Sequence, residues 1–302
     1  MQIDQLKKLL SEFGSDVRFE QDLKKKNWFN IGGSSKVFYI ANDLKKLILF
    51  LKKLDNKEKL FVLGAGSNTL ISDNLFDGVV IKFSKNFNNI SLLGENVIIA
   101  GSAVLDKDLS KFAYKNNLSG FEFLSGIPGT IGGGIKMNAG CFGKEFKDIL
   151  ISVQAIDKHG KVITIPAKDI KFEYRKNNLP NDLIFLSASF KGTKGISKNI
   201  ENEMNRLKSE KSKTQPTRVK TIGSTFKNPK SQTRKKVWEL IKQSVPLDVK
   251  FGDASISNKH CNFFINEGNA SFEDMSKLID FVAKNVLEKT GISLEKEIKI
   301  LK

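Results

Sequence analysis

The chain has 302 residues, of which 40% are hydrophobic and 27% are charged, as is typical of a soluble globular protein with two or three domains. Fifty Lys and Arg residues against 33 Asp and Glu residues give a net charge of +17. Only two cysteines and two histidines are present, and no apolar run approaches 18 residues, so the sequence excludes a disulfide scaffold, argues against a zinc site and predicts no membrane-spanning helix.

Residues 3–13 place apolar side chains at helical spacing and predict a short amphipathic helix. Further helices are predicted over 43–54, with Asn42 or Asp43 as N-cap, and over 105–116. Short apolar runs bounded by turn residues predict strands. They cover residues 36–40, 59–63, 79–83, 90–93, 97–100, 151–157, 161–166 and 183–190, with a hairpin turn at 158–160.

A polar stretch with two glycines, residues 191–198, precedes a charged segment that predicts a helix over 199–211. We place a domain boundary at this change of composition. Beyond it the patterns predict helices over 237–244 and 271–289 and strands over 262–265 and 297–301. The sequence therefore predicts a mixed α/β protein with two domains, residues 1–198 and residues 199–302.

The first glycine cluster follows a predicted strand and reads Leu63-Gly64-Ala65-Gly66-Ser67-Asn68. A dinucleotide-binding GxGxxG loop needs a third glycine where Thr69 stands, and a helix after it, whereas the pattern here predicts a turn and a strand. The sequence therefore excludes a Rossmann loop. Two interpretations stay open, a tight turn or a nest of backbone N–H groups that binds an anion with help from the Ser67 hydroxyl.

The second cluster is denser, with seven glycines in residues 120–140. Each glycine costs about 0.5–1 kcal/mol in the interior of a helix or strand, so this density argues against regular structure. Ser125, Thr130 and Asn138 add hydrogen-bonding groups without charge. The segment predicts close approach of the backbone to an extended, flat, anionic ligand such as a flavin dinucleotide, with a purely structural loop as the alternative.

Three stretches of the first half, 63–68, 121–133 and 137–140, resemble the flavin-binding half of the UDP-N-acetylenolpyruvoylglucosamine reductase (MurB) family. Residues 28–33, Trp-Phe-Asn-Ile-Gly-Gly, are similar to an early motif of that family, although Asn30 stands where a basic residue is usual. The second half continues the resemblance in Phe172-Glu-Tyr-Arg175, in Gly223-Ser-Thr-Phe-Lys-Asn-Pro229 and in the terminal Glu297 segment. The compact chain is most similar to the shorter, second type of the family.

The resemblance implies a vanillyl-alcohol-oxidase-type (PCMH-type) FAD-binding domain followed by a C-terminal α/β substrate-binding domain. It implies an oxidoreductase of peptidoglycan precursor synthesis that reduces the enolpyruvyl ether UDP-N-acetyl-3-O-(1-carboxyvinyl)-glucosamine to UDP-N-acetylmuramate. FAD is then expected as a non-covalent cofactor that relays a hydride, NADPH as the co-substrate, and no metal.

The resemblance also assigns candidate site residues. Arg175 is expected to bind the substrate carboxylate bidentately, Ser224 to donate a proton, and Glu297 to pair with Arg175 or to polarise that carboxylate. The structural alternatives are a surface arginine, a serine that caps the following segment and a glutamate exposed on an edge strand. Expected FAD contacts are Gly64, Ala65, Gly66, Ser67, Asn68, Ser125, Gly126, Ile127, Pro128, Gly129, Gly132, Gly133, Asn138 and Gly140.

Lys227 and Asn228 are expected to contact the UDP diphosphate, and Lys259 and His260 the nucleotide. For His260 a structural role is an equal alternative. Cys141 lies next to the flavin segment, but without a second cysteine nearby we interpret it as a small buried filler rather than a redox residue.

Two rival functions use the same features. An FAD oxidase of the same fold is one, although neither His159 nor His260 lies in a glycine cluster where flavin could be attached covalently. A nucleic-acid binder is the other, suggested by the charge but without aromatic–basic interleaving, and with only five arginines. We expect a cytoplasmic monomer or weak oligomer whose partners are the UDP-sugar and NADPH, with no nucleic acid and no membrane insertion. The positive charge then serves anionic ligands.

Overall fold

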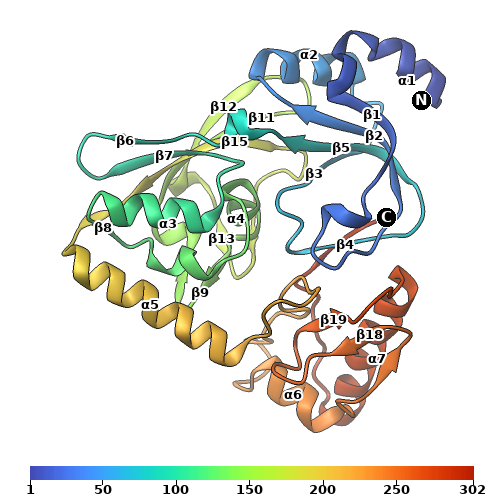
Figure 1. The fold of residues 1–302 in the computed structure, drawn as a ribbon, viewed down its shortest axis with the longest axis vertical. Coiled ribbons are helices and arrows are strands. Elements are labelled where there is room, and N and C mark those ends of the chain that lie inside the picture. Colours follow the sequence, from blue (N-terminus) through green and yellow to red (C-terminus); the bar gives the residue numbers. More distant parts are fainter. The chain divides into compact units, whose positions relative to one another are not determined.

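The structure is a computed structural model that describes residues 1–302, and the chain divides into two compact units (Figure 1). Unit 1 comprises Met1–Gln21, Lys36–Ala65 and Asp77–Lys211. Unit 2 comprises Asp22–Ser35, Gly66–Phe76 and Ser212–Lys302, so two early segments of the chain belong with its C-terminal part.

The larger sheet of unit 1 has the strand order β12-β11-β15-β7-β6, with every neighbouring pair antiparallel. The helices α3 (Asp106–Lys115) and α4 (Ile131–Met137) pack against it and share one apolar core with its strands (Figure 1). The strands are β6 (Ile90–Leu93), β7 (Val97–Gly101), β11 (Leu150–Ile156), β12 (Val162–Pro166) and β15 (Ile184–Lys191).

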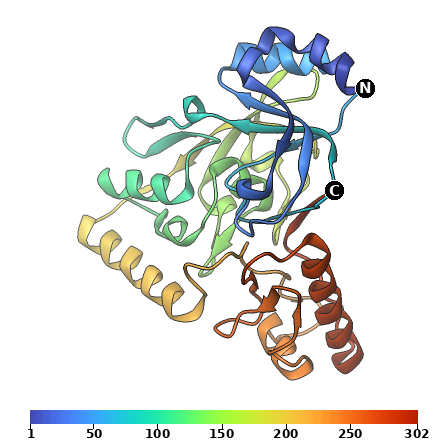
Figure 2. The ribbon, with the colours of Figure 1, turned by 45° about the vertical axis from the view of Figure 1, so that its right-hand side comes forward.

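A second sheet has the order β1-β2-β5-β3 and is covered by α1 (Ile3–Leu9) and α2 (Leu44–Leu54), which lie over it in Figure 2. The Tyr39 and Phe50 rings stack at 3.8 Å in this second core, and Asp43 caps α2 by accepting from the Lys46 amide. The strands are β1 (Val17–Asp22), β2 (Ser34–Ala41), β3 (Leu60–Val62) and β5 (Phe76–Phe83).

Short paired strands and a long helix complete unit 1. The helix α5 (Ser197–Thr214) buries Ile200, Met204 and Leu207 along one face, and Leu207 joins the core of the larger sheet. Unit 1 therefore extends to Lys211, beyond the predicted boundary at residue 198. The paired strands are β8 (Leu118–Ser119) with β16 (Thr193–Lys194), β9 (Gly140–Cys141) with β10 (Lys144–Glu145), and β13 (Phe172–Glu173) with β14 (Lys176–Asn177).

Unit 2 packs α6 (Val237–Ser244) and α7 (Phe272–Thr290) with a three-stranded sheet. Ser271 and Asp274 form the predicted capping box of α7, and Gly291 ends it with a φ of 71°. Phe29, Ile31 and Leu70 from the early segments join this core. The strands are β17 (Lys250–Phe251), β18 (Ala254–Ile256), β19 (Phe264–Asn266), and β4 (Thr69–Ile71) in parallel pairing with β20 (Lys299–Leu301).

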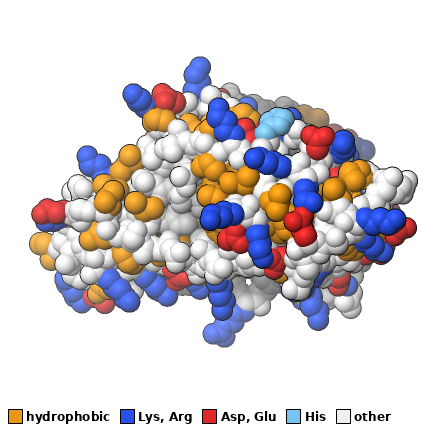
Figure 3. All heavy atoms as spheres, turned by 90° about the horizontal axis from the view of Figure 1, so that it is seen from above, with side chains coloured by type: hydrophobic (Ala, Val, Ile, Leu, Met, Phe, Trp, Pro, Cys, Tyr) orange, Lys and Arg blue, Asp and Glu red, His pale blue; other side chains and the backbone are white.

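Most predicted helices and strands are confirmed within a few residues, and α6 matches its predicted bounds. One prediction is wrong: three of the seven glycines of residues 120–140 lie in helix α4, where regular structure was not expected. None of the helices combines the length and the apolar character that crossing a bilayer requires. On the face drawn in Figure 3, Lys and Arg side chains lie interspersed with acidic and uncharged ones.

Candidate flavin site and reaction residues

The glycine segment, defined as residues 125–133, runs antiparallel to residues 102–106 of unit 1. The amide of Asp106 donates to the carbonyl of Gly129, the amide of Ile131 to that of Val104, and the amide of Gly132 to that of Ser102. These bonds hold the segment between the end of β7 and the start of α3. The backbone of residues 129–132 is thus held in place by its neighbours in unit 1.

Several glycines of residues 120–140 face atoms of the protein itself. A Cβ on Gly134 would lie 2.3 Å from the Phe146 ring, one on Gly140 would lie 2.2 Å from the Lys144 carbonyl, and one on Gly129 would lie 2.6 Å from Asp106 Oδ2. The glycine density is therefore explained in part by close packing. Gly126 and Gly133 differ, because a Cβ there would meet nothing nearer than 3.6 Å, so at these two positions the chain itself does not require glycine.

Unpartnered buried polar atoms flank the glycine segment. They are Ser125 Oγ within it, Ser102 Oγ beside Gly132, and both carboxylate oxygens of Asp106 beside Gly129. Buried polar groups nearly always have a partner, so such a group can mark where a ligand binds. The segment thus offers backbone groups, buried hydroxyls and two glycines without close steric contacts, and these residues fit a flavin dinucleotide.

The first glycine cluster crosses from unit 1 to unit 2 between Ala65 and Gly66. The Lys82 ammonium donates to the Gly64 carbonyl at 2.6 Å in unit 1. In unit 2 Gly66 has a φ of 70°, and a Cβ there would lie 2.4 Å from the Lys26 carbonyl. Close packing of backbone against backbone accounts for a glycine at this position. The predicted cofactor contacts of this cluster stay predictions: Gly64, Ala65, Gly66, Ser67 and Asn68.

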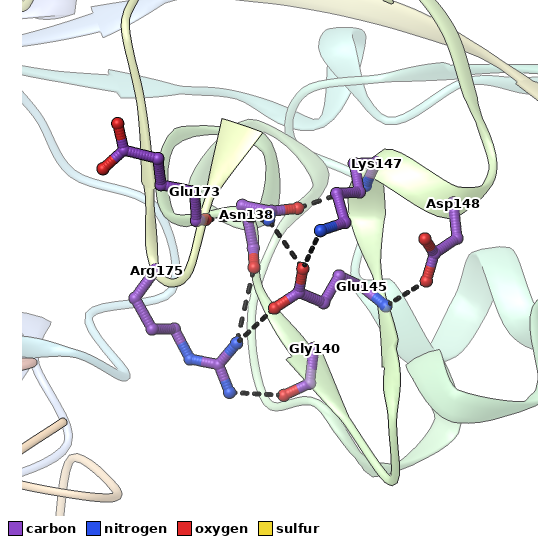
Figure 4. Close-up of polar contacts among 7 residues, drawn as sticks. All are labelled: Asn138, Gly140, Glu145, Lys147, Asp148, Glu173 and Arg175. Atoms are coloured by element: carbon purple, nitrogen blue, oxygen red, sulfur yellow. Dashed lines mark hydrogen bonds and ion pairs between the residues drawn. The ribbon is translucent and has the colours of Figure 1, made fainter. Parts of the chain in front are cut away.

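Arg175 lies in the turn between β13 and β14 with a φ of 59°, and its guanidinium faces the turn that follows α4 (Figure 4). It donates to the carbonyls of Gly140 at 2.7 Å and Asn138 at 3.4 Å, and lies 3.8 Å from the Glu145 carboxylate. The Tyr174 ring packs 4.9 Å from the guanidinium carbon. Only 15% of the Arg175 side chain is exposed, so the surface-arginine alternative is wrong.

Asn138 is fully buried at the centre of this cluster, in the left-handed conformation that ends α4. Its amide donates to Glu145 Oε2 and to the Glu173 carbonyl, both at 3.0 Å, and its Oδ1 accepts from the Lys147 amide at 3.1 Å (Figure 4). Both N–H donors thus have partners within the chain. These bonds account for asparagine here without a ligand, while Ile127, Pro128 and Asn138 stay predicted FAD contacts.

Cys141 and Lys211 meet on the other side of the glycine segment, near Gly126. The Cys141 thiol donates to the Phe123 carbonyl at 3.1 Å, and burial raises its pKa to about 11 against the opposing effects of Lys211 and Arg175. The thiol is therefore protonated at neutral pH, as a filler would be. The Lys211 ammonium donates to the Gly126 carbonyl, and burial lowers its pKa.

In unit 2 the segment 224–227 is hydrogen-bonded on one side to residues 262–263 and on the other to residues 295–297. The Thr225 amide donates to the Asn262 carbonyl at 2.8 Å, and the Glu297 amide donates to the Thr225 carbonyl at 2.8 Å. The side chain of Asn262 holds Phe226 through both its amide and its carbonyl. The fold therefore brings Ser224 and Glu297 to adjacent backbone positions. No helix begins within the next few residues after Ser224, so the capping alternative has no helix to cap.

The other predicted nucleotide contacts have partners inside unit 2. Lys227 pairs with Glu295, and Asn228 Oδ1 accepts from the Val237 amide that begins α6. His260 Nδ1 accepts from the Asn262 amide at 3.2 Å, and burial lowers the pKa of this imidazole. A hollow beside α6 is strongly basic; its lining residues are Asn228, Lys230, Thr233, Arg234, Lys235 and Lys236.

Asp106 and Lys211 were not among the predicted site residues, although the sequence pattern around both carried a signal. Asp106 shares the apolar face of α3 with Leu109 and Ala113, at spacings of three and seven residues. Lys211 continues the buried spacing of Met204 and Leu207 on α5. A charged residue on an otherwise apolar helix face is the pattern that identifies each of them.

Two family models match the chain. Residues 36–166 match an FAD binding domain, and residues 215–301 match the C-terminal domain of UDP-N-acetylenolpyruvoylglucosamine reductase. The predicted fold class, an FAD-binding domain followed by a C-terminal α/β domain, is therefore confirmed, and so is FAD as the cofactor.

Similar proteins cover the chain from end to end. The UDP-N-acetylenolpyruvoylglucosamine reductase of Pelagibacter ubique is 66% identical over 302 residues, all of both chains. That of Rickettsia conorii is 47% identical over 286 residues, covering 94% of this chain and 95% of its own. The crystal structure of the Thermus caldophilus enzyme matches with a TM-score of 0.80 at 28% identity, covering 95% of this chain and 98% of that one.

Proposed function

Because the chain belongs to the UDP-N-acetylenolpyruvoylglucosamine reductase family, and is thus an FAD-containing oxidoreductase, we propose that it reduces the enolpyruvyl ether of UDP-N-acetylglucosamine to UDP-N-acetylmuramate with NADPH. The observation that carries this proposal is the 66% identity over the whole chain to a reductase of that name. FAD, when bound, supplies the two-electron chemistry that links oxidation of NADPH to reduction of the ether.

Residues of the chain have to stabilise the negative charge that develops during the reaction. Addition of a hydride to the methylene carbon of the enolpyruvyl group builds negative charge on the adjacent carbon and its carboxylate. Arg175 binds that carboxylate in this proposal, since a guanidinium can donate two parallel hydrogen bonds to it. The bonds to the Gly140 and Asn138 carbonyls support the role, because they hold the guanidinium in one orientation.

Ser224 delivers the proton to the carbanionic carbon. A serine hydroxyl is a weak acid, so the transfer needs the strongly basic carbon and close placement. Backbone bonding on both sides of Thr225 supports this role, because it fixes the residue next to Ser224 and places Glu297 beside it. Glu297 then acts on the same carboxylate end of the substrate, as a protonated donor or through Arg175.

The basic hollow that includes Asn228 and Arg234 suits the diphosphate of the nucleotide. Lys227 and His260 complete the proposed contacts to the UDP portion, and a structural role is the alternative for the half-buried His260, whose pKa is lowered by burial. The working location is the cytoplasm, where the nucleotide-linked substrate and NADPH both occur.

The test separates the two halves of the reaction by stopped-flow absorbance of the flavin. Ser224→Ala is expected to be reduced by NADPH at the wild-type rate and to lose reoxidation by the enolpyruvyl substrate by at least about a thousandfold, the scale of a lost proton donor. Ser231→Ala is the matched control, because Ser231 is an exposed serine seven residues further along the chain. Loss of both half-reactions in Ser224→Ala would make Ser224 structural, and wild-type reoxidation would remove it from the mechanism.

Arg175→Lys tests the bidentate role. Lysine keeps the charge but not the fork, so reoxidation should fall nearly as far as in Arg175→Ala. Arg206→Lys is the control, since Arg206 is an exposed arginine that pairs with Glu203 and Glu210 on α5. Full activity of Arg175→Lys would exclude a bidentate contact.

A further inference from the structure

Asp106 takes no part in the reaction proposed above, yet its burial is unusual for a carboxyl group. The side chain has 0% exposure, and neither of its oxygens has a hydrogen-bond partner in the chain. It lies in the first turn of α3, on the face that also carries the buried Leu109 and Ala113. Asp residues are almost never fully buried without a partner, so this position needs an explanation.

The carboxyl group points at the glycine segment. The Asp106 amide donates to the Gly129 carbonyl at 3.2 Å, and Oδ2 lies 2.6 Å from the place that a Cβ on Gly129 would occupy. Ser125 Oγ and Ser102 Oγ, also buried and unpartnered, belong to the same segment and to the strand end against which it pairs. The unpartnered groups of this region thus gather where FAD is expected.

Burial raises the pKa of the Asp106 carboxyl well above its ordinary value, because a charge without a partner is strongly disfavoured away from water. The titratable groups around it do not offset this effect. Cys141 is a protonated thiol whose own pKa Asp106 helps to raise, and Lys211 and Arg175 act on that thiol while donating to backbone carbonyls. A neutral acid still carries an O–H donor that needs an acceptor.

We propose that Asp106 is a cofactor-binding residue, a neutral carboxylic acid that donates a hydrogen bond to an acceptor atom of FAD lying against the glycine segment. The inference rests on the FAD-binding domain and is independent of the sugar substrate. A carboxyl group kept for stability alone would have a partner within the chain. An unpartnered buried carboxyl group lowers the stability of the flavin-free protein. Such a group is expected where a bound ligand supplies the missing hydrogen-bond partner.

The test is rebinding of FAD to the full-length protein after flavin removal, followed by quenching of flavin fluorescence. Asp106→Leu should weaken FAD binding by about tenfold or more, the cost of one lost hydrogen bond to a ligand. Asp106→Asn keeps an N–H donor of the same shape and should bind within about threefold of wild type. Asp108→Leu, which removes a partly exposed carboxylate from the same helix turn, should change affinity by less than about twofold.

The flavin-free proteins provide the second measurement. Asp106→Leu should unfold at the same temperature as wild type or higher, because it replaces an unpartnered polar group with an apolar one. Wild-type FAD affinity in Asp106→Leu, or equal losses of affinity and of unfolding temperature in both Asp106 variants, would overturn the proposal and make the residue structural.

Infrared difference spectroscopy tests the proposal even if the leucine variant does not fold. The wild-type protein should show the carbonyl band of a protonated carboxylic acid that shifts when FAD binds and that is missing in Asp106→Asn. A spectrum without such a band, or a band that FAD does not shift, would overturn the proposal.

Discussion

Two neighbouring regions of unit 1 differ in whether their buried polar groups have hydrogen-bond partners within the chain. In the Arg175 cluster, the residues drawn in Figure 4, the buried amide of Asn138 and the guanidinium of Arg175 donate to acceptors of the chain. In the glycine segment and the helix start beside it, Ser125 and Asp106 have buried oxygens without any partner. The glycine segment ends at Gly133 within α4, and Asn138 directly follows that helix, so the two regions are only a few residues apart in sequence.

The difference separates groups that hold the fold from groups that await a ligand. A satisfied cluster fixes the backbone, and its removal should cost stability whether or not a cofactor is bound. Unpartnered groups cost stability in the free protein and are compensated only on binding. Substitutions in the two regions should therefore have opposite signs in the flavin-free protein, and four measurements can break or sharpen that contrast.

Asn138→Ala should have the largest effect on stability. It removes three partly buried hydrogen bonds and puts alanine in a left-handed conformation that asparagine adopts more easily, so the free energy of unfolding should fall by about 3 kcal/mol. Urea unfolding of the flavin-free protein measures it. Asn89→Ala, at an exposed asparagine that donates to the Asn86 carbonyl, should cost about 0.5 kcal/mol or less. Similar losses for both would mean that the Arg175 cluster does not hold the turn.

Gly134→Ala should come next. The new methyl group would lie 2.3 Å from the Phe146 ring, which is fully buried in the unit 1 core and cannot move away freely. Overpacking of this kind costs about 2 kcal/mol. Thermal unfolding followed by circular dichroism is the measurement. An unchanged unfolding temperature would show that the ring has room to shift.

Asp106 should give the flavin-free protein a distinctive pH dependence. Since its folded-state pKa is raised, the folded protein binds more protons than the unfolded chain above the unfolded pKa of about 3.9. Stability is therefore lost as pH rises from there toward the folded-state pKa, by up to about 1.4 kcal/mol per pH unit from this group.

Asp106→Asn should remove that loss, so the stability difference between the variant and the wild type should grow with pH. Urea midpoints at a series of pH values test this expectation. A difference that is constant with pH would mean that Asp106 is not protonated in the folded, flavin-free protein.

Gly133→Ala should have the smallest effect and the opposite sign. Gly133 lies in α4 beside Gly134, but a Cβ there would only meet Thr130 Oγ1 at 3.6 Å. Alanine favours a helix interior over glycine by about 0.5–1 kcal/mol, so the flavin-free protein should become slightly more stable. Calorimetry with and without FAD measures both states. A destabilised free protein would show that the space beside Gly133 is already filled.

Much of the chain could be predicted from local patterns. The capping box at Ser271 and the C-terminal Gly291 defined α7, the alternation in 151–166 defined a hairpin, and the order of the motifs identified the family. The missed elements were short strands and α4, because two-residue strands carry too little pattern and because glycines in α4 lower its helix propensity.

Local patterns could not predict how the chain divides into its two units, because each unit combines segments that are far apart in the sequence. Residues 22–35 and 66–76 join unit 2 because Leu70 enters its core and β4 pairs with β20 at the end of the chain. Pairings of this kind link residues more than two hundred positions apart, and no local periodicity records them. The composition change at 198 marked a polar loop, but the apolar face of α5 keeps that helix with unit 1.

The sequence by itself determined the family, the cofactor and the identity of the residues proposed for catalysis, since these depend on motifs in which neighbouring residues act together. Only the tertiary structure decided what each glycine and each polar group faces. A Cβ on Gly134 would clash with a ring, one on Gly66 would clash with a carbonyl and one on Gly133 would make only an ordinary contact with Thr130, although all three are the same residue in the sequence. Asp106 and Asp108 look alike along the chain, but one is fully buried and the other is paired with Lys111 near solvent. Burial and partners are properties of the packed chain, so a side chain's chemistry becomes defined only once its neighbours are in place.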